Sequence, residues 1–336
     1  MSHREQDSTA LPTGPQRTFG VGRDTERADP GQTEAMPGRK MHSDEIDTDV
    51  YLVSRLLAEQ CPQWARLPIK PVPSSGTVNA IYRLGDDMYV RLPRVKRWAS
   101  DLEKEQRWLP KLARHLPLAI PESLAKGSPG EGYPFHWGVY RWLRLETWTA
   151  NQISDLREAA ADLAQFIKAL ERIGTTGGPS PRAGGCGAPL AERDRDVRAA
   201  IEASRDIVDA DALTKAWDAA RQADEWNQPP VWVHGDLRPG NLLVAGGHLS
   251  AVIDFGGLSV GDPACDLAPA WTFFSGESRE AFRAALTFDE ATWIRGRGWA
   301  LTRVVNLPYY LETNPEIVAE ARHTLEQVLA DDRRSD

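Results

Sequence analysis

Apolar residues recur at helical spacing through most of the second half of the chain. The clearest stretch spans 153–173, where Ile153, Leu156, Ala160, Leu163, Ile167 and Leu170 repeat about every 3.6 residues. Further helices are predicted over 190–206, 211–226, 263–274, 277–287, 290–303 and 315–330. The Gly- and Pro-rich segment 174–189 predicts a long irregular loop, of the kind that is usually mobile or functional. The pattern therefore predicts a larger, mostly helical C-terminal region.

Shorter, alternating patterns dominate the region before it. A helix is predicted over 49–60, two strands over 78–84 and 88–92 joined at Gly85-Asp86-Asp87, and a third strand-like stretch over 133–143. Ser100-Asp101-Leu102-Glu103 has the pattern of a capping box, which predicts a helix from there to about Arg114, with a kink at Pro110. These elements predict a small antiparallel sheet with one main helix.

The first 44 residues lack this patterning. Gly, Pro, Ser, Thr and charged residues dominate residues 1–44, with scarcely any large apolar side chain. Such a segment buries too little surface to offset the entropy of ordering it, so we predict a disordered N-terminal tail.

Composition narrows the class of protein. The chain has 336 residues, of which 41% are hydrophobic, enough for two lobes with packed interiors. A net charge of −8 argues against a nucleic-acid or anionic-membrane partner, because both require a basic face. Three scattered cysteines, with no Cys/His cluster, signal segment or membrane-spanning run, predict a cytoplasmic protein without zinc or disulfides. The oligomeric state stays open.

One motif carries most of the chemical information. Val233–Asn241 reads VHGDLRPGN, and Asp254-Phe255-Gly256 follows an apolar hairpin with Gly246-Gly247 at its turn. Phosphoryl transfer from a nucleoside triphosphate needs a carboxylate for the attacking hydroxyl and two oxygen ligands for Mg²⁺. Asp236 has the position of the base, and Asn241 and Asp254 have the positions of the metal ligands in kinase catalytic and metal loops.

These residues resemble a known family. The HGDLRPGN stretch, followed by IDFGGLSVGDPACDLA over 253–268, is similar to the aminoglycoside phosphotransferase and choline kinase-like family of small-molecule kinases. The resemblance extends from about residue 45 to 330 and implies an α+β, protein kinase-like two-lobe fold. Its lobes are expected at 45–142, which binds the nucleotide, and at 143–332, which is catalytic and binds the acceptor.

The resemblance also implies a nucleotide site. Ser75, Gly76 and Thr77 occupy the place of the turn that covers the phosphates, where backbone N–H groups approach an anion. Arg141 and Trp142 occupy the hinge that faces the base of ATP or GTP, although the Gly that often follows is absent.

A cation is expected on the third strand of such a fold, held by a carboxylate of the main helix. Arg91 stands where protein kinases have Lys, and its expected partner is Glu105. Arginine and lysine differ because the guanidinium group of arginine presents its N–H donors in a fork. Either side chain can supply the fixed positive charge that the phosphates require. A surface Arg91 on an edge strand is the structural alternative.

The remaining residues of the motif receive supporting roles. Arg238 is a candidate for neutralising charge in the transition state, with a solvated side chain as the alternative. His234 is expected to support the loop by packing near the Asp-Phe-Gly turn. Asp262 and Asp266 are expected to cap a helix and hold the loop in place.

The sequence predicts a Mg²⁺-dependent kinase that phosphorylates a hydroxyl of a small molecule. The acceptor is open between an aminoglycoside and a metabolite such as an amino alcohol, ketosamine or nucleoside, because fold does not settle substrate. A catalytically silent nucleotide-binding module is a second alternative, motivated by Arg91 and the missing hinge glycine. A protein kinase is disfavoured, since no room for an activation loop remains between Gly256 and Gly261.

Overall fold

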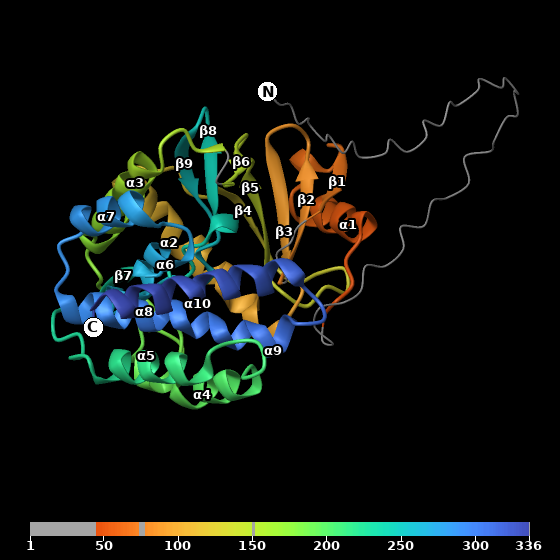
Figure 1. Cartoon of the computed structure of the whole chain (residues 1–336). Coiled ribbons are helices and arrows are strands. Elements are labelled where there is room, and N and C mark those ends of the chain that lie inside the picture. The colour runs from red at the N-terminus through yellow and green to blue at the C-terminus, as the bar shows by residue number, and fades with distance from the viewer. Residues whose placement is uncertain (1–44, 74–77, 150–151, 336) are drawn as a thin grey trace, which may run out of the picture. The chain divides into compact units, whose positions relative to one another are not determined.

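Five antiparallel strands form a sheet in the order β1-β2-β3-β5-β4 (Figure 1). The computed structural model describes residues 45–73, 78–149 and 152–335, all within one compact unit. The predicted tail over 1–44 and the turn residues Ser75, Gly76 and Thr77 lie outside the described residues. The strands of this sheet are β1 (Ile69–Val72), β2 (Asn79–Leu84), β3 (Met88–Pro93), β4 (Ser123–Gly127) and β5 (Trp137–Arg141).

Two helices accompany the sheet, and they pack differently. The first, α1 (Val50–Gln60), begins at Asp49, whose side chain accepts a hydrogen bond from Leu52 N at 2.7 Å. Its apolar face joins the strands in a hydrophobic cluster of their own. The second, α2 (Ala99–Leu112), buries its C-terminal half in a different cluster, where the rings of Trp108 and Trp232 lie 4.8 Å apart. Helix α2 therefore links the sheet to the rest of the molecule.

The capping box predicted at the start of α2 is wrong. The chain enters this helix from a 3-10 turn, so the helix begins at Ala99 and its first residue is preceded by Trp98, which makes no side-chain cap. Ser100 is thus already inside the helix, and Glu103 is an exposed residue of its second turn. Pro110 falls in the last turn, and the helix continues past it to Leu112.

Helices dominate the C-terminal region. They are α3 (Leu156–Glu171), α4 (Asp194–Ala203), α5 (Ala210–Gln222), α6 (Pro269–Thr272), α7 (Gly276–Ala285), α8 (Glu290–Leu301), α9 (Asn306–Tyr310) and α10 (Pro315–Ser335). Short 3-10 helices occupy Pro62–Trp64, Lys96–Trp98, Ala113–His115, Leu190–Arg193, Pro239–Asn241, Phe255–Gly257, Pro263–Leu267 and Thr302–Val305. Helix α8 packs between α5 and α10, and α3 packs on α7 (Figure 1). A small sheet and a helical region together form the predicted two-lobe α+β fold.

Two small sheets within this helical region flank the loops that contain the sequence motifs HGDLRPGN and Asp-Phe-Gly. A three-stranded sheet has the order β6-β8-β9, and a two-stranded ribbon pairs β10 with β7. Their bounds are β6 (Glu146–Thr147), β7 (Val231–Val233), β8 (Leu242–Ala245), β9 (His248–Val252) and β10 (Ser259–Gly261). The β8–β9 hairpin turns at Gly246 and Gly247, as the sequence predicts, with φ of 56° and 87°. The loops on either side of this hairpin hold the site residues.

The helix predicted over 263–274 is replaced by two short elements. Residues Pro263–Leu267 form a 3-10 helix and Pro269–Thr272 a single turn of α-helix. Pro269 explains the break, because it lacks the N–H that a continuous helix needs from its interior residues. Among the residues that the structure describes, no helix combines the length and apolar character needed to cross a membrane.

Candidate active site

The loop from His234 to Asn241 is held by Asp266. The carboxylate of Asp266 accepts hydrogen bonds from His234 N at 2.6 Å and Gly235 N at 2.8 Å. Gly235 has φ of 83°, and a Cβ built on it would lie 2.6 Å from the carbonyl oxygen of Gly257. Only glycine fits such a conformation and such a close approach. The loop is thus fixed by these two hydrogen bonds and by tight backbone contact with the Asp-Phe-Gly turn.

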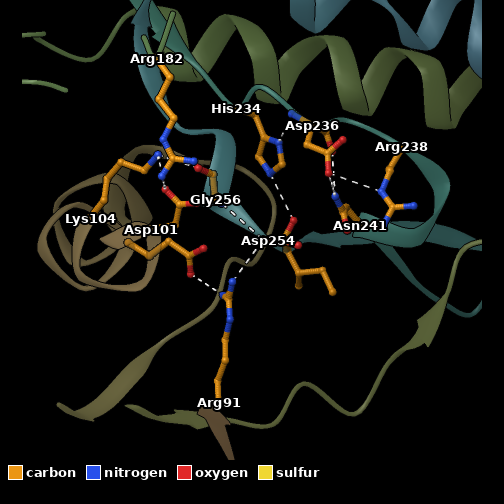
Figure 2. Close-up of polar contacts among 12 residues, drawn as sticks. Arg91, Asp101, Lys104, Arg182, His234, Asp236, Arg238, Asn241, Asp254 and Gly256 are labelled. Atoms are coloured by element: carbon orange, nitrogen blue, oxygen red, sulfur yellow. Dashed lines mark hydrogen bonds and ion pairs between the residues drawn. The ribbon is translucent and has the colours of Figure 1, made fainter. Parts of the chain in front are cut away.

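Asp236 is surrounded by three donor groups. Asn241 Nδ2 donates to both the backbone and side-chain oxygens of Asp236, at 2.9 Å each (Figure 2). Arg238 Nε lies 3.4 Å from Asp236 Oδ2, and Arg303 Nη2 lies 3.5 Å from Oδ1. Burial alone raises the pKa of Asp236, but Arg303 and Arg238 outweigh it, so the net pKa lies below the ordinary value. The carboxylate therefore stays ionised at neutral pH.

Asp254 follows β9 in a left-handed backbone conformation, with φ of 61°. Such a conformation is uncommon for a residue other than glycine, and it is often found at functional sites. Its Oδ1 accepts from Gly256 N at 3.4 Å and lies 3.3 Å from Arg91 Nη2. This conformation turns the carboxylate of Asp254 toward the cation on β3 (Figure 2).

His234 supports both loops from behind, as predicted. Its Nδ1 accepts from Asp236 N at 3.2 Å, and its Nε2 lies 3.2 Å from the carbonyl oxygen of Ile253. Its ring packs on Phe255 with centroids 4.5 Å apart. Burial lowers the pKa of His234, so a neutral ring protonated on Nε2 satisfies both bonds. The imidazole is a structural link between the Asp236 and Asp254 loops.

Arg91 and Glu105 form the predicted ion pair. Arg91 Nη1 donates to Glu105 Oε2 at 2.6 Å, and the side chains are 8% and 0% exposed. Because β3 lies between β2 and β5 in the sheet, the alternative of a surface arginine on an edge strand is wrong. Arg91 contacts Glu105 and Asp254 at once and so connects the sheet, α2 and the metal loop.

A second set of charges joins α2 to the C-terminal region, and sequence reasoning missed it. Lys104 Nζ donates to the carbonyl oxygen of Gly256 at 2.6 Å (Figure 2). Asp101 lies between Lys104, at 3.4 Å, and Arg182, which comes from the long loop between α3 and α4. Asp101 and Lys104 have i,i+3 spacing within α2, but no local spacing signals the contacts to Gly256 and Arg182, which lie far away along the chain.

Many of these groups border one cleft of about 710 Å³, whereas Glu105, His234 and Asp266 lie behind its walls. The cleft walls include the predicted nucleotide residues Arg141 and Trp142 and the residues Arg91, Lys104, Arg182, Asp236, Arg238, Asn241 and Asp254. Arg141 pairs with Glu122 at 2.6 Å, and Trp142 N donates to Asp87 O at 2.7 Å. Arg303, which the sequence analysis did not single out, reaches Asp236 from the 3-10 helix after α8.

The oxygen donors of Asn241 and Asp254 suit a magnesium ion. The amide nitrogen of Asn241 is engaged by Asp236, which leaves its oxygen as the group available to a cation. Mg²⁺ is typically held by one or two protein oxygens together with substrate phosphates and water. The described residues contain no cluster of three or more His, Cys, Asp or Glu side chains able to hold a metal.

Comparison with known proteins agrees with this geometry. The phosphotransferase enzyme family matches residues 69–301. The fold is similar to that of wild-type aminoglycoside 2′-phosphotransferase-IIIa in its GDP complex, with a TM-score of 0.64 and 18% identity over 85% of this chain and 100% of that one. It is also similar to macrolide 2′-phosphotransferase type I, with a TM-score of 0.57 and 21% identity over 84% and 98%. No curated protein matches the sequence.

Proposed function

The chain belongs to the phosphotransferase enzyme family, and we propose that it transfers the γ-phosphoryl group of ATP or GTP to a hydroxyl of a small molecule. One observation carries this proposal. Asp236, Asn241 and Asp254, which come from two loops, border the same cleft as Arg91, which is paired with Glu105. That is the set of groups that phosphoryl transfer requires.

Asp236 is proposed to receive the acceptor hydroxyl. The hydroxyl oxygen attacks the γ-phosphorus, the bond from that phosphorus to the nucleoside diphosphate breaks, and the hydroxyl proton passes to Asp236. Because two arginines keep the pKa of this carboxyl low, Asp236 is a weak base that acts mainly by orienting the hydroxyl. Orientation suits a loose transition state, in which the proton leaves late.

The donor nucleotide is proposed to lie between the sheet and the β8–β9 hairpin. Arg91, fixed by Glu105, supplies positive charge to the phosphates, and Arg238 adds charge beside Asp236. Backbone groups near Arg141 and Trp142 face the base. The predicted division follows from this placement, with the nucleotide bound mainly by residues 45–142 and the acceptor by 143–332.

Asn241 and Asp254 are proposed to hold Mg²⁺ through their side-chain oxygens. When bound, the ion neutralises charge on the phosphates as the γ-phosphoryl group leaves. The inward position of both side chains and the left-handed backbone of Asp254 support this assignment. We also propose a cytoplasmic location, where the nucleotide is available and Cys61, Cys186 and Cys265 remain free thiols.

Related structures support a two-substrate reaction. One of them, with a TM-score of 0.62 and 18% identity, is the GDP and kanamycin complex of an aminoglycoside 2″-phosphotransferase. The silent-module alternative is disfavoured here, because Asp236 contacts Asn241, and Arg91 contacts both Glu105 and Asp254, which supports the proposed roles of these residues.

The replacement Asp236→Asn tests the proposal. Nucleotide turnover, measured as release of ADP or GDP with Mg²⁺ and with water or an added acceptor, should fall about 10²- to 10⁴-fold. Asp211→Asn is a matched control, since that side chain is 88% exposed on α5. Retention of turnover within tenfold in Asp236→Asn would refute the assigned role, provided that the control behaves like the wild type.

A further inference from the structure

The guanidinium of Arg303 has N–H donors that make no hydrogen bond to the described residues, and it lies beside Asp236, the proposed site of the reacting hydroxyl. Its side chain is only 23% exposed, and its single ion pair with the described residues is the one to Asp236, at 3.5 Å. A guanidinium carries five N–H donors, more than one distant carboxylate can engage. No hydrogen bond from Arg303 to another described residue accompanies that pair. Arg303 is therefore a charged group beside Asp236, which lines the cleft, and its remaining N–H donors can bind an anion there.

The charges in the cleft oppose a cationic acceptor. Three carboxylates line the described walls, and each already has cationic partners: Asp101 with Lys104 and Arg182, Asp254 with Arg91, and Asp236 with Arg238 and Arg303. None of the three remains for an ammonium group. An ammonium next to the hydroxyl at Asp236 would instead lie close to two arginines, which is unfavourable in a partly buried site.

A further arginine, Arg97, lies beside a residue of the cleft wall. Trp98 lines the cleft, and the guanidinium of Arg97 lies 3.8 Å from its ring centroid. The charges of Arg97 and Arg238 also act on the hydroxyl of Tyr310, whose pKa burial raises. On the other side, Glu320 is the carboxylate that acts on Arg303 besides Asp236. Asp236 and Glu320 both favour the charged form of Arg303, so the guanidinium remains a cation.

We propose that Arg303 is an acceptor-binding residue and that the acceptor carries an anionic group, a carboxylate or a phosphate, beside the hydroxyl that is phosphorylated. This inference rests on the proposed function and narrows its substrate class. Two N–H groups of one guanidinium match the two oxygens of such an anion. With the anion on Arg303, the hydroxyl is brought to Asp236, and transfer proceeds as described above.

A set of sugars with one scaffold and different charge tests the inference. Glucuronate, glucose 6-phosphate, glucose, glucosamine and the polycation kanamycin are offered with Mg²⁺ and ATP or GTP, and kcat/KM is measured by nucleoside diphosphate release corrected for turnover in water. The two acidic probes distinguish a carboxylate from a phosphate. Wild type, Arg303→Gln, Arg303→Lys and the exposed Arg195→Gln (93% exposed) are compared.

Acidic sugars are expected to be preferred over glucose, and glucose over glucosamine and kanamycin. Arg303→Gln should lower kcat/KM for the acidic probe about 10- to 100-fold more than for glucose, the range for a hydrogen bond to a charged group. Arg303→Lys should restore part of that preference, and Arg195→Gln should behave as the wild type. A purely structural role would lower both values equally, leaving the ratio unchanged.

Two results overturn the inference. One is a cationic probe that is the best acceptor, and the other is an acidic probe that never exceeds its neutral counterpart, including the case in which no sugar reacts. Failure of the proposed function looks different, because the wild type would then lack nucleotide turnover in water that depends on Asp236.

Discussion

The guanidinium of Arg91 lies 2.6 Å from the carboxylate of Glu105, and the two side chains are 8% and 0% exposed. The pair joins a central strand of the sheet to α2, and Arg91 continues to Asp254 at 3.3 Å. Burial is the main cause that raises the pKa of Glu105, to about 7, while Arg91 acts in the opposite direction. Glu105 Oε1 has no partner among the described residues. Arg91 is therefore the group that balances the negative charge of the buried Glu105 carboxylate.

Removing that cation should be costly. Arg91→Ala leaves Glu105 buried without a counterion, and we expect the free energy of unfolding to fall by about 3–5 kcal/mol. Arg91→Lys keeps the charge but loses the forked geometry, so it should cost less than Arg91→Ala and retain nucleotide turnover. Urea denaturation measures both variants, and an Arg91→Ala protein as stable as the wild type would contradict the interpretation.

Gly235 is expected to be irreplaceable, in contrast to another glycine of similar backbone conformation. In Gly235→Ala the new methyl group would lie 2.6 Å from the carbonyl oxygen of Gly257, whereas at Gly246, with φ of 56°, it would meet nothing within 4 Å. Gly246→Ala should therefore cost only the conformational strain of about 1 kcal/mol, while Gly235→Ala should cost more and abolish turnover. Thermal denaturation and nucleotide turnover compare the two, and equal effects would show that close approach does not limit the loop.

Asp266 should control the position of Asp236 without touching a substrate. Asn in its place keeps one oxygen acceptor but presents an NH₂ group to one of the backbone N–H groups of His234 and Gly235. We expect Asp266→Asn to lower the free energy of unfolding by about 1.5–3 kcal/mol, the value of a hydrogen bond to a charged group. Turnover should fall more than tenfold even where the protein is folded. Circular dichroism with turnover at one temperature checks this, and a folded, fully active variant would exclude the role.

Glu171 should make the stability depend on pH. Burial, followed by the charge of Asp266, raises its pKa from 4.5 to about 7, and its Oε1 has no partner among the described residues. The folded protein therefore holds a proton that the unfolded chain has lost, so this contribution is complete below about pH 4.5 and disappears as the pH rises through 7.

Glu171→Gln mimics the protonated form and should remove that dependence. The variant should match the wild type near pH 5 and exceed it near pH 8 by about 2 kcal/mol, a figure reduced for partial solvent screening. Urea denaturation of both proteins at the two pH values gives the difference directly. A difference that is the same at both pH values would show that Glu171 does not titrate with folding.

The sequence determined the elements whose cause is local. Helix α3 follows from apolar spacing and from Asp155, which caps its first turn, and the β8–β9 hairpin follows from Gly246 and Gly247 between two apolar runs. The capping box at Ser100 failed because the preceding 3-10 turn moved the start of the helix. Such a shift depends on how the chain arrives at the helix, which the motif alone does not contain.

The proposed catalytic residues were likewise predictable, because Asp236, Asn241 and Asp254 lie on two neighbouring loops whose spacing is a local property. Only the tertiary structure decided which charged side chains lie around these residues. Arg303 meets Asp236, and Arg182 meets Asp101, only after distant segments pack together. The physical reason is that patterns of residues along the sequence specify local conformation. The electrostatic environment of a site, in contrast, is set by charged side chains that the fold brings together from distant segments.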